Sequence, residues 1–154
     1  MEKIAVFPGS FDPITRGHES VVVRSVDLFD KIIIAIGTNS NKEGFFSLEK
    51  RVNWINKTFE AYNSIEVMHY EGLTTEFCKQ VNARFLLRGI RTSADFEYER
   101  SIAQMNKKMM PEIETVLILT EPDLTPISST ILRDIYRHGG DIKPFVPKAI
   151  HTDL

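Results

Sequence analysis

The chain has 154 residues, of which 42% are hydrophobic and 26% charged, as expected for one compact globular domain. Its net charge of −2 gives no overall basic surface, so we expect no nucleic-acid partner. The single cysteine excludes a disulfide framework and a cysteine-based zinc site. No apolar stretch approaches the roughly 20 residues of a membrane span. The first residues do not form a signal peptide, so we expect a cytoplasmic protein with no membrane partner.

Apolar runs alternate with segments of helical character along the whole chain. We expect strands at residues 3–7, 31–36, 65–69, 84–87 and 115–119. We expect helices at residues 17–29, 48–62, 75–81, 94–109 and 128–137, with a short last helix after Pro147. Ser47 and Ser93 are the expected N-caps of the second and fourth helices. The alternation predicts a single α/β domain over residues 1–154, a Rossmann-like three-layer fold with a five-stranded parallel sheet.

The segment that follows the first predicted strand reads PGSFDPITRGH, from Pro8 to His18. A strand, a glycine-containing loop and a helix start form the layout in which backbone N–H groups face a phosphate. The segment matches neither G-x-x-x-x-G-K-[ST] nor G-x-G-x-x-G. It carries a histidine at the helix start in place of a lysine. We therefore predict phosphate chemistry with a different group for stabilising charge.

Polar side chains follow the predicted strands, and ligands of open parallel sheets bind outside the carboxyl ends of the strands. The cations Lys42, Arg88 and Arg91 converge with two helix starts on that edge, which predicts an anion site for more than one phosphate. Each feature also has a plainer explanation. A single loop cation is most often only solvated, and the hydroxyls at residues 128–130 could simply cap a helix.

His18 is the strongest single candidate in the sequence. The helix dipole disfavours a charged histidine at a helix N-terminus, so a structural role there would gain little. A bound triphosphate would favour the charged form, and both protonation states stay open at this point.

An apolar stripe runs along the fourth predicted helix, at Tyr98, Ile102, Met105 and Met109. Residues at this spacing lie on one helix face, which predicts packing in the core or against a partner subunit. Cys78 is expected to be a buried helix residue.

Three segments together resemble the bacterial phosphopantetheine adenylyltransferases, in the nucleotidyltransferase superfamily. They are PGSFDPITRGH at residues 8–18, RGIRTSADFEYE at residues 88–99, which continues to Met105 and Asn106, and ISST at residues 127–130, followed by Arg133. The first segment alone is similar to the histidine-bearing loop of the whole superfamily. The second and third are much more specific to this family, and the resemblance covers nearly all of the chain.

The resemblance implies an enzyme, a pantetheine-phosphate adenylyltransferase of coenzyme A biosynthesis. It would transfer the adenylyl group of ATP reversibly to 4′-phosphopantetheine, giving dephospho-CoA and pyrophosphate, with Mg²⁺ bound to ATP and with no metal-ligating side chain assigned. A homohexamer and feedback by coenzyme A are also implied. The alternative is a nucleotidyltransferase acting on another phosphorylated acceptor, nicotinate mononucleotide or glycerol phosphate. A non-catalytic nucleotide-binding module would not need His18, Lys42 and Arg91 together.

The resemblance also implies roles for individual residues. His18 would stabilise the transition state, and Lys42 and Arg91 would act with it in catalysis. The residues that would bind ATP are Ser10, Phe11, His18, Gly89, Ile90, Arg91, Glu99, Leu124, Thr125, Pro126, Ile127, Ser128, Ser129 and Thr130. The residues that would bind phosphopantetheine are Ser10, Lys42, Leu73, Thr74, Arg88, Met105 and Asn106.

Overall fold

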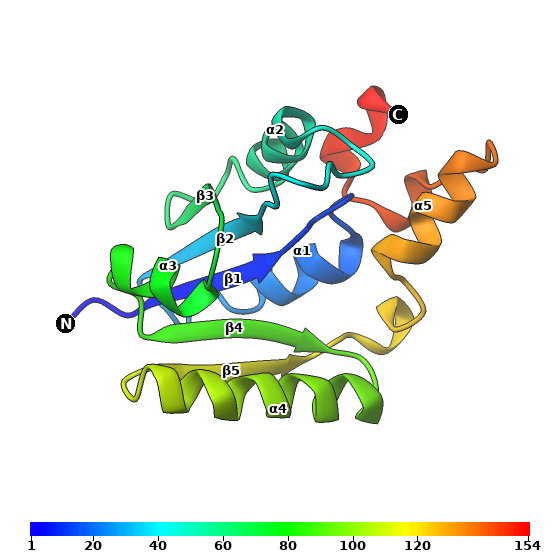
Figure 1. The fold of residues 1–154 in the computed structure, drawn as a ribbon. Helices are drawn as coiled ribbons and strands as arrows, with labels where there is room; N and C mark the ends of the chain where they lie inside the picture. Colours follow the sequence, from blue (N-terminus) through cyan, green and yellow to red (C-terminus); the bar gives the residue numbers. More distant parts are fainter.

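The computed structural model describes residues 1–154 and contains a five-stranded parallel sheet with the order β3-β2-β1-β4-β5 (Figure 1). The strands are β1 (Ile4–Gly9), β2 (Lys31–Gly37), β3 (Ile65–Tyr70), β4 (Phe85–Ile90) and β5 (Glu114–Leu119). The α-helices are α1 (Arg16–Val23), α2 (Leu48–Thr58), α3 (Thr74–Gln80), α4 (Ser93–Met109) and α5 (Ser129–Arg137). Three short 3₁₀ helices complete the chain, η1 (Pro122–Leu124), η2 (Lys143–Phe145) and η3 (Lys148–Asp153). The predicted α/β class and parallel sheet are confirmed.

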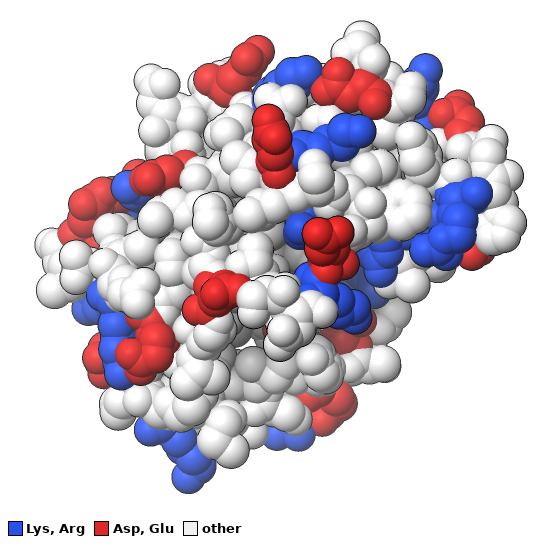
Figure 2. Space-filling model, turned by 45° about the horizontal axis from the view of Figure 1, so that its top comes forward, with Lys and Arg blue, Asp and Glu red and all other residues white.

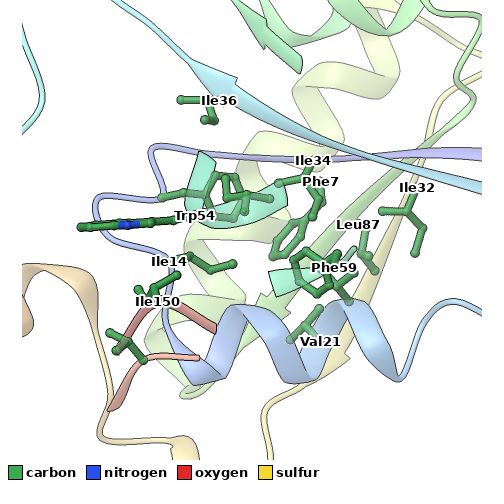
Figure 3. Close-up of a cluster of buried hydrophobic side chains, with 14 of the residues drawn as sticks. Phe7, Ile14, Val21, Ile32, Ile34, Ile36, Trp54, Phe59, Leu87 and Ile150 are labelled. Carbon is green, nitrogen blue, oxygen red and sulfur yellow. The ribbon is translucent and has the colours of Figure 1, made fainter. Parts of the chain in front are cut away.

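Helices cover both faces of the sheet because the central strands are apolar on both sides. Phe7 of β1 belongs to the larger buried cluster, which includes residues of α1, α2, α5 and the C-terminal segment. Its neighbour Val6 belongs to the second cluster, with residues of α3 and of the turn after α4. Figure 3 shows Phe7, Val21, Trp54 and Ile150 among the side chains of the larger cluster. No helix of the structure is both long and apolar enough to cross a membrane.

The strand pairing opens a space between β1 and β4. These two strands pair only at Ala5–Phe85 and Val6–Leu86, whereas β4 pairs with β5 along its whole length. The order of the strands reverses at the same place, between β1 and β4. A ligand site is expected at such a switch point in a parallel sheet. The strand ends point toward the side of the molecule on which α5 lies (Figure 1).

Several predicted boundaries are wrong. The helix expected at residues 17–29 ends at Val23, because the next backbone bonds, Ser25 N to Val22 O and Leu28 N to Ser25 O, are of the tighter turn type. The helix expected at residues 48–62 ends at Thr58, and a turn follows it.

Two further boundaries differ near the strand ends. The strand expected at residues 84–87 continues to Ile90, since Arg88 and Gly89 remain paired with β5. The N-cap of α4 is Thr92 and not Ser93, because the Thr92 hydroxyl accepts a hydrogen bond from the Asp95 N–H at 3.1 Å.

Candidate active site

Two adjoining pockets lie at the carboxyl ends of the strands. The first, of about 320 Å³, extends from the end of β1 toward the N-termini of α1 and α5. The second, of about 410 Å³, extends from the end of β1 toward α3 and α4. They share a wall formed by Pro8, Gly9, Ser10, Arg88 and Glu99. Two ligands bound in these pockets would therefore meet at this wall.

The backbone of α1 fixes the orientation of His18. Thr15 is the N-cap of α1, and its hydroxyl accepts a hydrogen bond from the His18 N–H at 3.3 Å. The Thr15 N–H in turn donates to the ring nitrogen Nδ1 of His18 at 3.0 Å. Because Nδ1 accepts this bond, the proton of the neutral ring is on Nε2. The ring of Phe11 packs edge-on against the imidazole, with 4.9 Å between the ring centres.

The environment keeps this imidazole neutral. Burial, followed by the positive charges of Arg88 and Arg91, lowers the pKa of His18 from 6.5 to about 4. At neutral pH, His18 offers the first pocket an uncharged N–H donor.

Arg88 is held in the shared wall by an ion pair and a backbone bond. Its Nη2 lies 2.8 Å from Oε1 of Glu99, and its Nε lies 3.0 Å from Oε2. Its Nη1 also donates to the carbonyl oxygen of Pro8. The guanidinium is therefore oriented before any ligand binds.

The first pocket has a second cation and two helix N-termini. Arg91 donates from Nε to Oδ2 of Asp95 at 3.1 Å and from Nη1 to the Ile127 carbonyl at 3.2 Å. Ser128 caps α5 by accepting from the Ile131 N–H at 3.2 Å. Since the starts of both α1 and α5 line this pocket, their N–H groups and dipoles favour an anion there.

The structure brings most of the predicted ATP-site residues together. Those that line the first pocket are Ser10, Phe11, His18, Gly89, Arg91, Glu99, Leu124, Ile127, Ser128, Ser129 and Thr130. Ile90, Thr125 and Pro126 lie next to lining residues in the chain but do not line the pocket themselves.

Most of the predicted phosphopantetheine residues line the second pocket, and two do not. Ser10, Leu73, Thr74, Arg88 and Asn106 line the second pocket. Met105 lies on the exposed side of α4, with 56% of its surface accessible. Lys42 is exposed in the loop after β2 and lines neither pocket. The structure therefore does not bring Lys42 to the other predicted residues.

Some lining residues did not stand out in the sequence. Thr15 lines the first pocket, and the spacing of Thr15 and His18 is that of a helix capping box, which would have indicated their contact. Tyr70 lines the second pocket, and its hydroxyl lies 2.7 Å from Oγ1 of Thr74. Its position at the end of β3 was the available signal.

Comparison with known proteins first defines the class. Residues 6–135 match the model of the cytidylyltransferase-like family. A bifunctional NMN adenylyltransferase/ADP ribose pyrophosphatase from Francisella tularensis superposes with a TM-score of 0.73 over 95% of this chain, at 17% identity. This chain spans 45% of that longer protein, and at 17% identity the likeness concerns the fold alone. The family match over residues 6–135 places the chain in the nucleotidyltransferase class.

Relatives of similar length define the family. Phosphopantetheine adenylyltransferase of Cytophaga hutchinsonii is 49% identical over 97% of this chain and 100% of its own length. The enzyme of the same name from Flavobacterium psychrophilum is 50% identical over 96% and 97%. That of Leptospira biflexa is 45% identical over 100% and 96%. The chain belongs to the phosphopantetheine adenylyltransferase family.

Proposed function

We propose that the two joined pockets hold the two substrates of an adenylyl transfer. The chain catalyses the reversible reaction of ATP with 4′-phosphopantetheine, which yields dephospho-CoA and pyrophosphate in coenzyme A biosynthesis. ATP would occupy the first pocket and phosphopantetheine the second. The observation that supports this arrangement is the shared wall at Ser10, Arg88 and Glu99, since a donor and an acceptor must meet for transfer.

The nucleophile is supplied by the substrate. A phosphate oxygen of phosphopantetheine attacks the α-phosphorus of ATP, and the bond from that phosphorus to the bridging oxygen of the leaving pyrophosphate breaks. No side chain needs to be acylated or phosphorylated, so the protein has to position two polyanions and offset their repulsion. Arg88 would bind the acceptor phosphate, and Arg91 with the two helix N-termini would bind the phosphates of ATP.

His18 would act as a preorganised hydrogen-bond donor. Its Nε2 carries the proton because Nδ1 accepts a hydrogen bond from the Thr15 N–H. A donor aimed at the α-phosphate would stabilise the charge that develops there in the transition state. In the free protein this donor is neutral, because burial and the charges of Arg88 and Arg91 lower the pKa of His18 to about 4.

Lys42 keeps its proposed role as a ligand of phosphate oxygens. In the structure its backbone N–H donates to the Asn39 carbonyl at 3.0 Å, and its side chain is exposed. The role requires the loop around Lys42 to approach the shared wall when substrates bind.

We propose that Mg²⁺ enters as a complex with ATP. Nowhere does the structure gather three or more side chains of the histidine, cysteine, aspartate and glutamate types around one point. Near the first pocket, the carboxylates of Asp95 and Glu99 already accept hydrogen bonds from Arg91 and Arg88. With these carboxylates already engaged, the phosphate oxygens of ATP would hold the Mg²⁺ ion, and the ion would neutralise part of their charge.

We further propose a homohexamer in the cytoplasm. On α4, Tyr98 is 66% exposed and Met109 45% exposed, and the stripe that they form with Ile102 and Met105 thus faces outward and not into the core. Tyr98, Ile102 and Met109 also line the second pocket, so contact with another copy of the chain would lie beside that pocket. Light scattering would measure the mass of the assembly.

We also propose feedback by coenzyme A, which would compete for the pockets that bind dephospho-CoA.

Pyrophosphate release tests the proposed function. The protein would be incubated with MgATP and, in parallel, with 4′-phosphopantetheine, nicotinate mononucleotide or glycerol phosphate. We expect rapid release only with phosphopantetheine, and dephospho-CoA as the second product. Faster release with one of the other two acceptors would overturn the assignment.

A further inference from the structure

Arg51 is a buried cation outside both pockets. Arg51 lies on α2 and only 7% of its surface is exposed. Burial of a guanidinium costs free energy of folding unless its N–H groups donate hydrogen bonds. Nε donates to the carbonyl oxygen of Phe46 at 3.0 Å, and Nη1 donates to the carbonyl oxygen of Ser10 at 2.9 Å. One side chain therefore joins the loop after β1 to the loop after β2.

Asp12 joins the same two loops a second time. Its buried carboxylate accepts from the Phe45 N–H at 2.7 Å and from the Phe46 N–H at 2.8 Å. Gly44 passes between the two side chains: a Cβ there would lie 2.8 Å from Nη2 of Arg51 and 3.0 Å from Oδ2 of Asp12. The absence of a side chain at position 44 thus permits both connections.

Ser10 links this network to the reaction. It lies in the wall that the two pockets share, and its carbonyl oxygen is the atom that Arg51 holds. The loop that is held at Phe46 also carries Lys42. Arg51 therefore fixes the backbone at the point where the two substrates would meet.

We propose that Arg51 is a positioning residue for adenylyl transfer. The inference rests on the proposed function. By bridging the carbonyls of Ser10 and Phe46, Arg51 holds the shared wall at Ser10 in the geometry that aligns donor and acceptor. A displacement of roughly 1 Å can cost about 10² in rate. Because Arg51 lines neither pocket, its loss should lower kcat more than it raises KM.

The substitution Arg51→Lys tests this role. Lysine keeps the charge but lacks the planar fork that reaches both carbonyls. We expect kcat to fall by about 10- to 100-fold, and KM for either substrate to change by less than about threefold. Ile113→Val is the matched control, because it thins the buried cluster on the opposite face of the sheet and lowers stability away from the pockets. It should keep the wild-type kcat.

Two measurements separate positioning from folding. Hydrogen exchange at the Phe45 and Phe46 amides should accelerate in Arg51→Lys and not in Ile113→Val. In a double-mutant cycle with Asp12→Asn, the combined loss of kcat should be smaller than the product of the single losses, since both residues hold one loop.

The outcomes distinguish this inference from the proposed function. A wild-type protein that releases no pyrophosphate with phosphopantetheine would overturn the function, and amide exchange would then decide whether Arg51 anchors the loops. An active wild type with an unchanged kcat in Arg51→Lys would overturn the positioning role. An equal loss of kcat in Ile113→Val would also overturn it, because lowered stability would then explain both.

Discussion

The carboxylate of Glu99 holds the guanidinium of Arg88 through two hydrogen bonds, of 2.8 and 3.0 Å. Glu99 is the one buried residue of α4, so the pair ties this otherwise outward-facing helix to the end of β4. The pair stands in the wall between the pockets, where it presents an oriented cation to both. Glu99 can therefore contribute to substrate binding by orienting Arg88, in addition to any direct contact with ATP.

Glu99→Gln should weaken the use of phosphopantetheine. Glutamine preserves the size of the side chain but removes the charge that orients Arg88. Hydrogen bonds to charged groups contribute about 1.5–3 kcal/mol, so kcat/KM should fall by roughly 10- to 100-fold. Steady-state kinetics would measure this. Glu97→Gln is the control on the same helix, because its pair with Arg100 is exposed and contributes little. Equal values for the two variants would contradict the prediction.

His18→Ala should lower kcat by at least about 10² while ATP binding changes little. The reason is that the Nε2–H donor would act mainly on the transition state. Turnover assays and equilibrium binding of ATP would separate the two effects. His138→Ala, at the exposed end of α5, is the control. Near-normal turnover of His18→Ala would refute the role of His18.

Arg88→Ala and Arg91→Ala should differ in the substrate that they affect. Arg88 lines both pockets and Arg91 only the first. We expect Arg88→Ala mainly to raise KM for phosphopantetheine, and Arg91→Ala mainly to raise KM for ATP, each by roughly 10- to 100-fold. Two-substrate kinetics would measure both constants. The opposite pattern would mean that the two phosphate sites are exchanged.

The low pKa of His18 should make stability fall in acid. The folded protein resists protonation of His18 down to a pKa of about 4, whereas the ordinary value is 6.5. Between these values the unfolded chain binds more protons, so the free energy of unfolding falls as the pH is lowered through this window and is fully restored above it. The contribution is on the order of 3 kcal/mol. Thermal unfolding against pH should show a smaller acid loss in His18→Gln than in the wild type; parallel curves would contradict this.

Gly89→Ala should disturb the packing of β4 against α1. A Cβ at this position would lie 2.9 Å from Cγ2 of Val21, a buried helix residue. Overpacking of this kind typically costs about 1–3 kcal/mol. Thermal unfolding would measure the loss, and the second substitution Val21→Ala should recover part of it by removing the overlapping methyl group. A double variant no more stable than Gly89→Ala would argue against the steric cause.

Much of the fold could be predicted because the central strands are continuous apolar runs. The run at residues 31–36 could hardly form anything but a buried strand, and the structure has β2 at Lys31–Gly37. The errors fell where local signals are weak. Arg88 and Gly89 look like loop residues by type, yet their backbone pairing continues because β5 lies alongside. Strand pairing between distant segments is not encoded in local composition.

The site could be predicted in part for a related reason. The strand ends, the helix starts and the resemblance pointed to His18, Arg88 and Arg91, and the structure gathers all three around the first pocket. Arg51 was missed because its partner Ser10 lies 41 positions away and offers only a backbone carbonyl. Such a contact leaves no pattern in residue types. On the face that Figure 2 shows, cationic and acidic side chains are interspersed, so their distribution there does not mark the site.

The wall that both pockets share has a consequence for ligand design. A single molecule that filled both pockets would carry its two recognition groups on one short linker. Binding of the first group would then raise the effective concentration of the second at its own pocket to roughly the millimolar range. Because the two pockets meet at Ser10, the linker would be short, and the ligand would lose little conformational entropy on binding. Joined in this way, two weak halves could make one tight ligand.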